Sequence, residues 1–463
     1  MQNLIFIIVF VIFNITGQAQ SNVKGQVSGY KEGKIKMIGS LGDQNYIADS
    51  AIISSDGKFS FTLTDKTKSG LYYFLLPDYK NFQLLFDQEK FIELATTKEK
   101  LVQDMRITGS TSNILLYEGL QIQIKIDSVQ QKIKSNTLST TENKAANDLL
   151  NVLIELRNQH LKKCFSDFPG EFYTIFKKAG QNPPVREFKK MNGTTDTMAQ
   201  VADYRARFWD DVPFRDERLL YTPVIGNKLK RYINELTPQV PDSIIRYADV
   251  VIKKSMVNDE MFQFVSNWIA LQYQPTKSTV MDGEAVYVYI IDKYFNEKTA
   301  HWFREGELEQ LRKKAGEMKA SLLNRKGPDV IAKDPYGVTK SIYEMKAPYI
   351  IVYMYNPNCE HCQKETPKLN KFYAEWKSKG VDLFAIVLDT NDDEWKNYIR
   401  KNNIEHWTHV FDPTNRAIYG KYYVDITPEM YVLNPERMII GKNLKTEQLS
   451  IIIERDMKKR GKM

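Results

Sequence analysis

The chain has 463 residues, of which 42% are hydrophobic and 26% are charged, and its formal net charge is +8. This length predicts about three domains at ~150 residues each, and each would be large enough to bury a core. The net charge is small for the length and spread along the chain, so we expect no nucleic-acid partner.

The N-terminus has the pattern of a secretory signal peptide over residues 1–19. Residues 4–13 are an uninterrupted apolar run that is too short to span a bilayer, and Gly17 and Ala19 supply small residues before a cleavage site after Ala19. We therefore expect export to the periplasm or cell envelope. Because Lys and Arg are absent ahead of the run, an uncleaved anchor and an ordinary core segment stay open as alternatives.

Residues 21–110 have a β pattern, with short runs rich in β-branched and aromatic residues. The run 58–64 alternates strictly between polar and apolar residues, so one of its faces is buried. Asp56-Gly57 just before it is typical of a hairpin turn. These features predict a small antiparallel sandwich or barrel, and we find no catalytic constellation in it.

Residues 111–323 change to a helical period, which predicts a central α-helical domain. Its many aromatic residues indicate packing between helices, and a ligand groove lined by Tyr204 and Trp209 is the alternative. Cys164 lies on an apolar stripe, three residues after Leu161, which predicts a buried free thiol rather than a regulatory or partner-linking one.

Residues 327–463 alternate between strand and helix, which predicts an α/β sheet with parallel crossovers. The expected strands and helices are 349–355, 359–378, 381–388, 392–401, 407–411, 414–419, a hairpin of 430–434 with 438–442, and a helix over 446–458.

Cys359 and Cys362 stand where the predicted strand ends and the helix begins. A thiolate there is stabilised by the helix dipole and by unpaired backbone N–H groups. We expect Cys359 to be the nucleophile, and Cys362, one turn inside the helix, to resolve the mixed disulfide. Between them, a protonated His361 would favour the thiolate and Glu360 would disfavour it, so the direction of the reaction stays open. Three cysteines are too few for a disulfide scaffold in an exported chain.

Structural zinc is the main alternative for a Cys-x-x-Cys pair, but it needs four ligands. The chain has no second cysteine pair, and His361 lies between the two cysteines. His406 and His409 straddle a strand start with their rings on different faces. We therefore expect neither a metal nor another cofactor.

The last third of the chain, from Gly327 onward, resembles a thioredoxin-like envelope thiol–disulfide oxidoreductase of the alkyl hydroperoxide reductase/thiol-specific antioxidant type. The motifs that carry the resemblance are Cys359-Glu360-His361-Cys362, Glu365-Thr366-Pro367, Ile386-Val387-Leu388-Asp389 and Thr427-Pro428 with Tyr431-Val432-Leu433-Asn434.

The resemblance implies that Pro428 is cis and packs against the disulfide, that Thr427 offers backbone hydrogen bonds to a bound partner, and that Glu365 and Pro367 have structural roles. Two features depart from the family. Asn358 stands where a Trp is common, and the strand 349–355 has no acid where thioredoxins carry a buried one, which leaves the proton-transfer residue open. No Thr precedes Cys359 at the spacing of the peroxidase relatives.

The first two segments also resemble domains that are found ahead of such modules, and this resemblance implies no mechanism for them. The expected function is an exported thiol–disulfide oxidoreductase that reduces disulfides of envelope proteins with electrons from a membrane donor. The alternative is an envelope binding or assembly protein whose cysteine pair only senses redox state.

Overall fold

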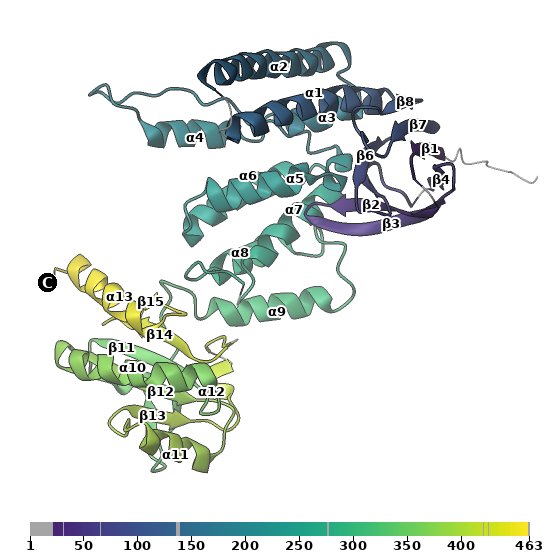
Figure 1. Ribbon diagram of the computed structural model, residues 1–463. Coiled ribbons are helices and arrows are strands. Elements are labelled where there is room, and N and C mark those ends of the chain that lie inside the picture. The colour runs from purple at the N-terminus through teal and green to yellow at the C-terminus, as the bar shows by residue number, and fades with distance from the viewer. Residues whose placement is uncertain are drawn as a thin grey trace, which may run out of the picture. The chain divides into compact units, whose positions relative to one another are not determined.

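The computed structural model describes residues 22–30, 32–64, 66–135, 139–275, 277–419, 421–424 and 426–461 (Figure 1). The expected signal peptide lies outside these residues. The chain divides into two compact units, Met1–Arg231 and Tyr232–Met463, so the division falls inside the segment predicted to be helical. Within the described ranges, we find no helix with the length and apolar character needed to cross a membrane.

The first unit begins with two four-stranded sheets, as the β pattern predicts. One has the order β4 (Lys58–Thr62), β1 (Asn22–Ser28), β7 (Phe91–Thr97), β8 (Arg106–Thr108), and the other β3 (Gln44–Ile53), β2 (Gly33–Leu41), β5 (Gly70–Leu75), β6 (Asn81–Phe86). Only β1 and β7 pair in parallel among the described strand pairs of these sheets. Phe59 and Phe61 of one sheet contact Phe74 of the other, with ring centroids 6.5 and 5.3 Å apart.

Two details of this domain differ from the sequence-based prediction. The prediction of a hairpin at Asp56-Gly57 is wrong, because this turn leads from β3 to β4, which lie in different sheets. Strand β3 was not expected, since most of its residues are exposed and it lacks the alternation that marks a half-buried strand.

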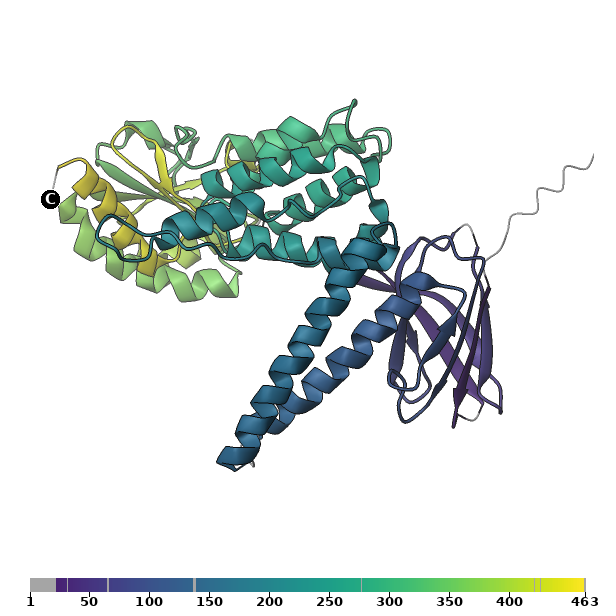
Figure 2. The same cartoon turned by 90° about the horizontal axis from the view of Figure 1, so that it is seen from above.

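Helices follow the sheets in the first unit. They are α1 (Thr111–Lys134), α2 (Thr140–Asp167), α3 (Phe172–Ala179), α4 (Thr197–Arg207) and α5 (Pro223–Lys230). Helices α1 and α2 run side by side as a long hairpin (Figure 2). Ser110 caps α1, and Ser139 with Glu142 forms a capping box on α2. Cys164 is fully buried, which confirms the prediction from its apolar stripe; Tyr204 and Trp209 are buried too, rather than lining an open groove.

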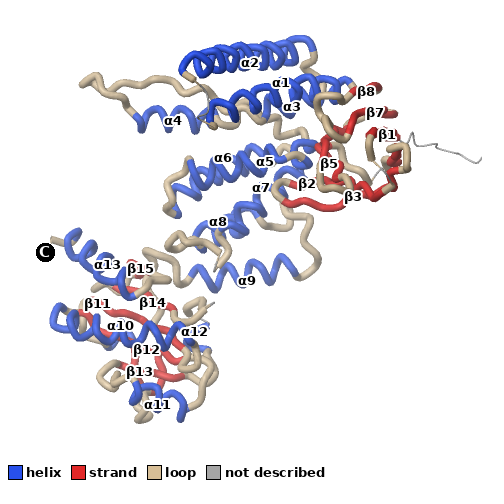
Figure 3. The backbone as a smooth tube through the Cα atoms, in the orientation of Figure 1, coloured by secondary structure: helices blue, strands red, loops and turns tan. Residues whose placement is uncertain are grey.

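After a short π-helix over Arg231–Glu235, the described part of the second unit continues with the α-helices α6 (Pro241–Ser255), α7 (Asp259–Gln272), α8 (Glu284–Tyr294) and α9 (Glu307–Lys319). From α1 to α9 the described segments are helices and loops, so the expected helical region is confirmed (Figure 3). Its aromatic residues pack on one another as expected. Trp302, for example, meets Phe262 and Phe295 with ring centroids 5.6 and 5.7 Å apart.

The chain ends in an α/β domain, which confirms the predicted fold of the last segment. Its sheet has the order β10 (Thr339–Ser341), β9 (Ile331–Lys333), β13 (Thr408–Phe411), β12 (Val381–Val387), β11 (Tyr349–Tyr355), β14 (Glu429–Leu433), β15 (Ile439–Gly441). Helices α10 (Glu360–Trp376), α11 (Asp392–Lys401) and α13 (Thr446–Lys459) pack on one face, and α12 (Arg416–Tyr419) on the other. Every residue of β11 is buried, as its uninterrupted apolar sequence indicates.

A buried ionic cluster connects this sheet to the preceding helices. The Lys442 ammonium, 3% exposed, lies 3.4 Å from an Asp282 oxygen and 3.6 Å from a Glu284 oxygen at the start of α8. The Asn443 amide also donates to Glu284, at 2.9 Å. Burial raises the pKa of Asp282 to about 6, although Lys442 opposes this shift. The cluster therefore holds two buried carboxyl groups with Lys442 as the cation between them, supported by hydrogen bonds from Asn443 and from the Leu323 backbone N–H.

We expect Lys442→Met to lower the free energy of unfolding of the second unit by about 3–5 kcal/mol, because it leaves buried carboxylates without a cation. Urea unfolding followed by tryptophan fluorescence measures the loss. Lys458→Met, at an exposed lysine of α13, is the matched control. Equal unfolding midpoints for the two variants would contradict a stabilising role of the cluster.

Candidate redox site

Cys359 occupies the N-cap position of α10, after a three-residue turn that follows the buried strand β11. Its backbone is extended, with φ −80° and ψ 121°, and its sulfur accepts the backbone N–H of Cys362 at 3.3 Å. The Asn356 side chain accepts the N–H of Asn358 at 2.7 Å, which fixes the turn between strand and helix. Cys359 is partly exposed, whereas Cys362 is fully buried. The structure thus places the two cysteines as their spacing predicts, with the outer sulfur at the helix N-terminus.

The surroundings move the acidities of the two thiols in opposite directions. Burial raises the pKa of Cys359, but hydrogen bonds to its sulfur from the Cys362 thiol, the Thr427 side chain and the Cys362 backbone N–H outweigh this effect, and the pKa of this thiol lies below its ordinary value. Burial, together with the hydrogen bond to Cys359, raises the pKa of Cys362 to about 12. Of this pair, the sulfur that ionises first is therefore also the sulfur that solvent reaches.

Thr427 and Pro428 lie beside the cysteines although they are far along the chain. Strand β14, which follows them, pairs with β11 in the register Met354↔Glu429. This pairing brings the Thr427 carbonyl to 3.2 Å from the Cys359 sulfur, whose thiol donates to it. The Thr427–Pro428 peptide bond is cis, the geometry that the resemblance implies.

Glu360 and His361, between the cysteines, are both exposed. The Glu360 carboxylate pairs with Lys364 one turn further along the helix, and this lysine lowers the pKa of the carboxyl. The negative charge of Glu360 is thus compensated locally, which weakens the unfavourable effect on the thiolate that the sequence suggests.

Glu365 lies on the inner side of α10 and is 9% exposed. Its carboxylate accepts the backbone N–H of Thr446, the first residue of α13, at 2.8 Å, and also pairs with Lys368 at 3.2 Å. Burial raises the pKa of Glu365, but the hydrogen bonds from Thr446 and Lys368 lower it by more than burial raises it, so the carboxyl group is ionised. Pro367, on the exposed side, cannot donate to the carbonyl of Gln363 within the helix.

The residues behind Cys362 were not singled out from the sequence. The Tyr398 hydroxyl donates to the Cys362 carbonyl at 3.2 Å and lies 2.7 Å from the Thr366 hydroxyl, which in turn lies 2.8 Å from that of Tyr353. Tyr353 and Tyr355 share the face of β11 that α10 covers, and their rings stack 5.2 Å apart. The alternation of tyrosines in this strand was the signal that could have indicated a polar cluster under the helix.

The two histidines of the His406–His409 segment do not form a metal site. His409 is 3% exposed and lies 2.7 Å from the Ile404 carbonyl, and burial lowers its pKa to about 4. The His406 ring stacks on Tyr373. Within the part of the chain that the structure describes, no three His, Cys, Asp or Glu side chains are grouped as metal ligands.

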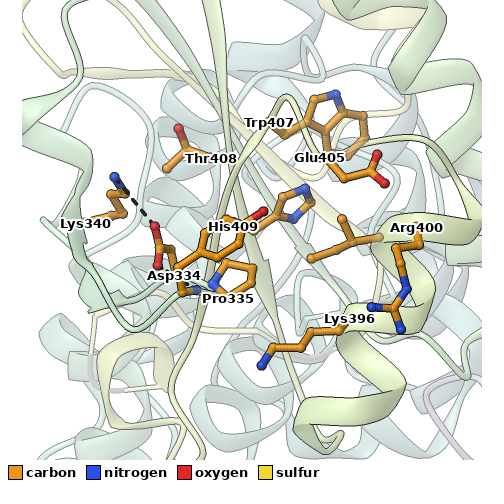
Figure 4. Close-up of a pocket in the computed structure, with 11 residues that line it drawn as sticks. Asp334, Pro335, Lys340, Lys396, Arg400, Glu405, Trp407, Thr408 and His409 are labelled. Carbon is orange, nitrogen blue, oxygen red and sulfur yellow. Dashed lines mark hydrogen bonds and ion pairs between the residues drawn. The ribbon is translucent and has the colours of Figure 1, made fainter.

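A cavity of about 690 Å³ lies at the edge of the sheet (Figure 4). It is bordered by the turn after β9, by α11 and by the start of β13. Lys340 and Asp334 form an ion pair of 3.6 Å on one side, and Lys396 and Arg400 lie on another. The described residues that line it do not include Cys359 or Cys362.

Comparison with known proteins gives matches for both ends of the chain. Residues 348–439 match a family model described as thioredoxin-like, and residues 21–116 match a domain of unknown function, DUF4369. The thiol-disulfide oxidoreductase ResA of Bacillus cereus is 22% identical over 120 residues, which cover 26% of this chain and 68% of the relative. The corresponding protein of Bacillus anthracis is 24% identical over 131 residues, covering 27% and 74%.

Two solved structures are also similar. A domain of a possible thiol-disulfide isomerase from Cytophaga hutchinsonii is 31% identical and covers 31% of this chain and 97% of its own, with a TM-score of 0.29. A thioredoxin-like protein from Bacteroides caccae is 16% identical and covers 59% and 99%, with a TM-score of 0.49.

In the reduced native protein, we expect iodoacetamide to label Cys359 alone near neutral pH. The thiolate is the reactive form, and the lowered pKa of Cys359 keeps it populated at a pH where Cys362 and the buried Cys164 are protonated thiols. The rate should rise with pH and level off at a lower pH than for the same cysteine in urea. Peptide mass spectrometry identifies the site, and equal labelling of Cys362 would contradict the asymmetry.

We expect Glu365→Ala to lower the free energy of unfolding by about 1–3 kcal/mol, because it leaves the buried Thr446 N–H without its acceptor. Glu375→Ala, at an exposed glutamate of the same helix, should have little effect. Thermal unfolding of both variants provides the comparison. Similar losses in the two variants would contradict a specific stabilising role of the bond between Glu365 and Thr446, because alanine itself favours the helix at both positions.

Proposed function

We propose that this chain, whose C-terminal domain belongs to the thioredoxin-like thiol–disulfide oxidoreductases, is exported and reduces disulfides of envelope proteins. The observation that carries the proposal is the asymmetric pair: Cys359 is partly exposed, caps a helix and has a lowered pKa, while Cys362 beside it is buried and protonated. Such a pair can attack a disulfide with one sulfur and release the product with the other.

The exchange has two balanced steps. The Cys359 thiolate attacks one sulfur of the substrate disulfide, forming a mixed disulfide and releasing the other substrate sulfur as a thiolate that takes up a proton. Cys362 then loses its proton and attacks the Cys359 sulfur, and the second substrate sulfur leaves and is protonated. Two electrons pass to the substrate, and the protein is left with a Cys359–Cys362 disulfide.

Thr427 and Pro428 are proposed to receive the substrate beside the reacting sulfur. In the reduced state the Cys359 thiol donates a hydrogen bond to the Thr427 carbonyl. Ionisation of Cys359 removes the thiol proton, so the carbonyl becomes free to accept an N–H from an extended substrate segment. We assign His361 and Glu360, the exposed residues between the two cysteines, a tuning role, in which Lys364 offsets the negative charge of Glu360.

The reducing direction requires a supply of electrons outside the cytoplasm, because an oxidised Cys359–Cys362 pair must be reduced again. We propose a membrane-bound thiol–disulfide donor as the second partner. The relatives named ResA support an oxidoreductase, and the expected signal peptide supports the periplasm or cell envelope as its location. A reduction potential near about −270 mV would agree with a reductant, whereas one near about −120 mV would indicate an oxidant.

We expect the full chain to catalyse the reduction of insulin disulfides by dithiothreitol, and Cys359→Ser to abolish this activity because the attacking sulfur is lost. Cys164→Ser is the matched control, since it changes a cysteine that is fully buried in the first unit. Turbidity of the released insulin chain measures the rate. Equal rates with and without Cys359 would contradict the enzyme assignment and favour a binding protein whose cysteine pair only senses redox state.

In envelope extracts, Cys362→Ala should accumulate mixed disulfides with substrate proteins, because the resolving sulfur is gone. The adducts should disappear when Cys359 is also replaced by Ser. Non-reducing electrophoresis followed by mass spectrometry identifies the trapped proteins, and adducts that persist without Cys359 would exclude it as the attacking residue.

A further inference from the structure

Three buried hydroxyl groups form a chain that ends on the backbone of Cys362. Tyr353 comes from β11, Thr366 from α10 and Tyr398 from α11, so three separate elements contribute. The hydroxyl oxygens of Tyr353 and Thr366 are 2.8 Å apart, and those of Thr366 and Tyr398 are 2.7 Å apart. The chain closes on the Cys362 carbonyl, 3.2 Å from the Tyr398 hydroxyl.

Counting the hydroxyl protons shows which group is the donor in each of these hydrogen bonds. A carbonyl only accepts hydrogen bonds, so the Tyr398 hydroxyl donates its single proton to the Cys362 carbonyl. The Tyr398 oxygen therefore accepts from Thr366, and the Thr366 oxygen accepts from Tyr353. Tyr353 and Thr366 are fully buried, and burial raises the pKa of Tyr398 to about 12, so this hydroxyl is a neutral donor under physiological conditions.

Cys362 is thereby held on both of its peptide planes. Its N–H belongs to the peptide that joins it to His361, and this group donates to the Cys359 sulfur at 3.3 Å. Its carbonyl belongs to the next peptide and accepts from Tyr398. Cys362 lies in the first turn of α10, where the helix sets its two backbone dihedrals, so an anchor on the carbonyl also restricts the orientation of the N–H.

We propose that Tyr398 is a positioning residue for thiol–disulfide exchange, which holds the Cys362 amide against the Cys359 sulfur by anchoring the Cys362 carbonyl. The inference rests on the proposed function, in which Cys359 is the attacking atom. Tyr398 takes no proton from either cysteine. It acts through the first turn of α10, and Thr366 and Tyr353 fix its orientation.

Tyr398→Phe tests the inference, because it removes the hydroxyl and retains the ring that packs 5.3 Å from Tyr355. The readout is the pH profile of Cys359 alkylation in the reduced full chain. We expect the profile to move to higher pH and the rate near neutral pH to fall about two- to tenfold, the worth of one hydrogen bond. A purely structural role would lower stability and leave the profile in place.

Tyr373→Phe is the matched control. Tyr373 is also buried, lies in α10 and donates its hydroxyl proton to Asp382 at 2.8 Å, away from the cysteines. Its alkylation profile should equal that of the unmodified chain. An unchanged profile in folded Tyr398→Phe, or an equal shift in both variants, would overturn the inference.

Thr366→Val keeps the test decisive should Tyr398→Phe fail to fold. It removes the donor to the Tyr398 oxygen in nearly the same volume, and we expect a smaller shift of the profile in the same direction. No shift here would overturn the inference as well. The outcome is separate from that of the proposed function, because alkylation reports on Cys359 even in a chain that fails to reduce insulin.

Discussion

The hydrogen bond from the Cys362 amide to the Cys359 sulfur is the interaction on which the redox site depends. It exists because Cys359 caps α10, where the first N–H groups of the helix have no partner within the helix. A serine or aspartate usually satisfies such groups through oxygen. Here a sulfur does so, and the same bond that completes the helix stabilises the ionised form of the thiol.

The rest of the domain keeps this short contact in place. Strand β11 is central in the sheet and buried on both faces, so the position where it ends is fixed from both sides. Its antiparallel neighbour β14 brings Thr427 to the Cys359 sulfur, and α11 brings the Tyr398 hydroxyl to the Cys362 carbonyl. Glu365 connects the same helix to the start of α13. The Cys359 sulfur therefore lies in a short turn that contacts from several elements of the domain hold in place.

The sequence was informative where the decisive pattern is local. The apolar run 349–355, the cysteine spacing and the alternation after Gly327 predicted the strand, the start of the helix and the α/β fold. Strand β3 escaped prediction because exposure of both faces removes the two-residue period. The turn residues at Asp56-Gly57 were recognised, but turn chemistry does not specify whether the next strand joins the same sheet.

Contacts between distant residues were the part that could not be read from the chain. Thr366 and Tyr398 are 32 residues apart, and their hydroxyls meet only because α10 and α11 pack on one face of the sheet. Asn443 and Glu284 are 159 residues apart, and Lys442 gives no local sign that it will be buried between acids. Polar groups of this kind become visible only once the fold supplies their partners.

The burial of Cys164 has a consequence for the stoichiometry of exchange. Of the three cysteine sulfurs in the chain, two are fully buried, so in the proposed exchange Cys359 is the sulfur that an incoming disulfide can reach. A protein with several accessible thiols can hold more than one client at a time and can shuffle its own bridges. This chain would instead alternate between one dithiol form and one disulfide form. Each molecule would then hold one substrate at a time, and different substrates would compete for the same sulfur.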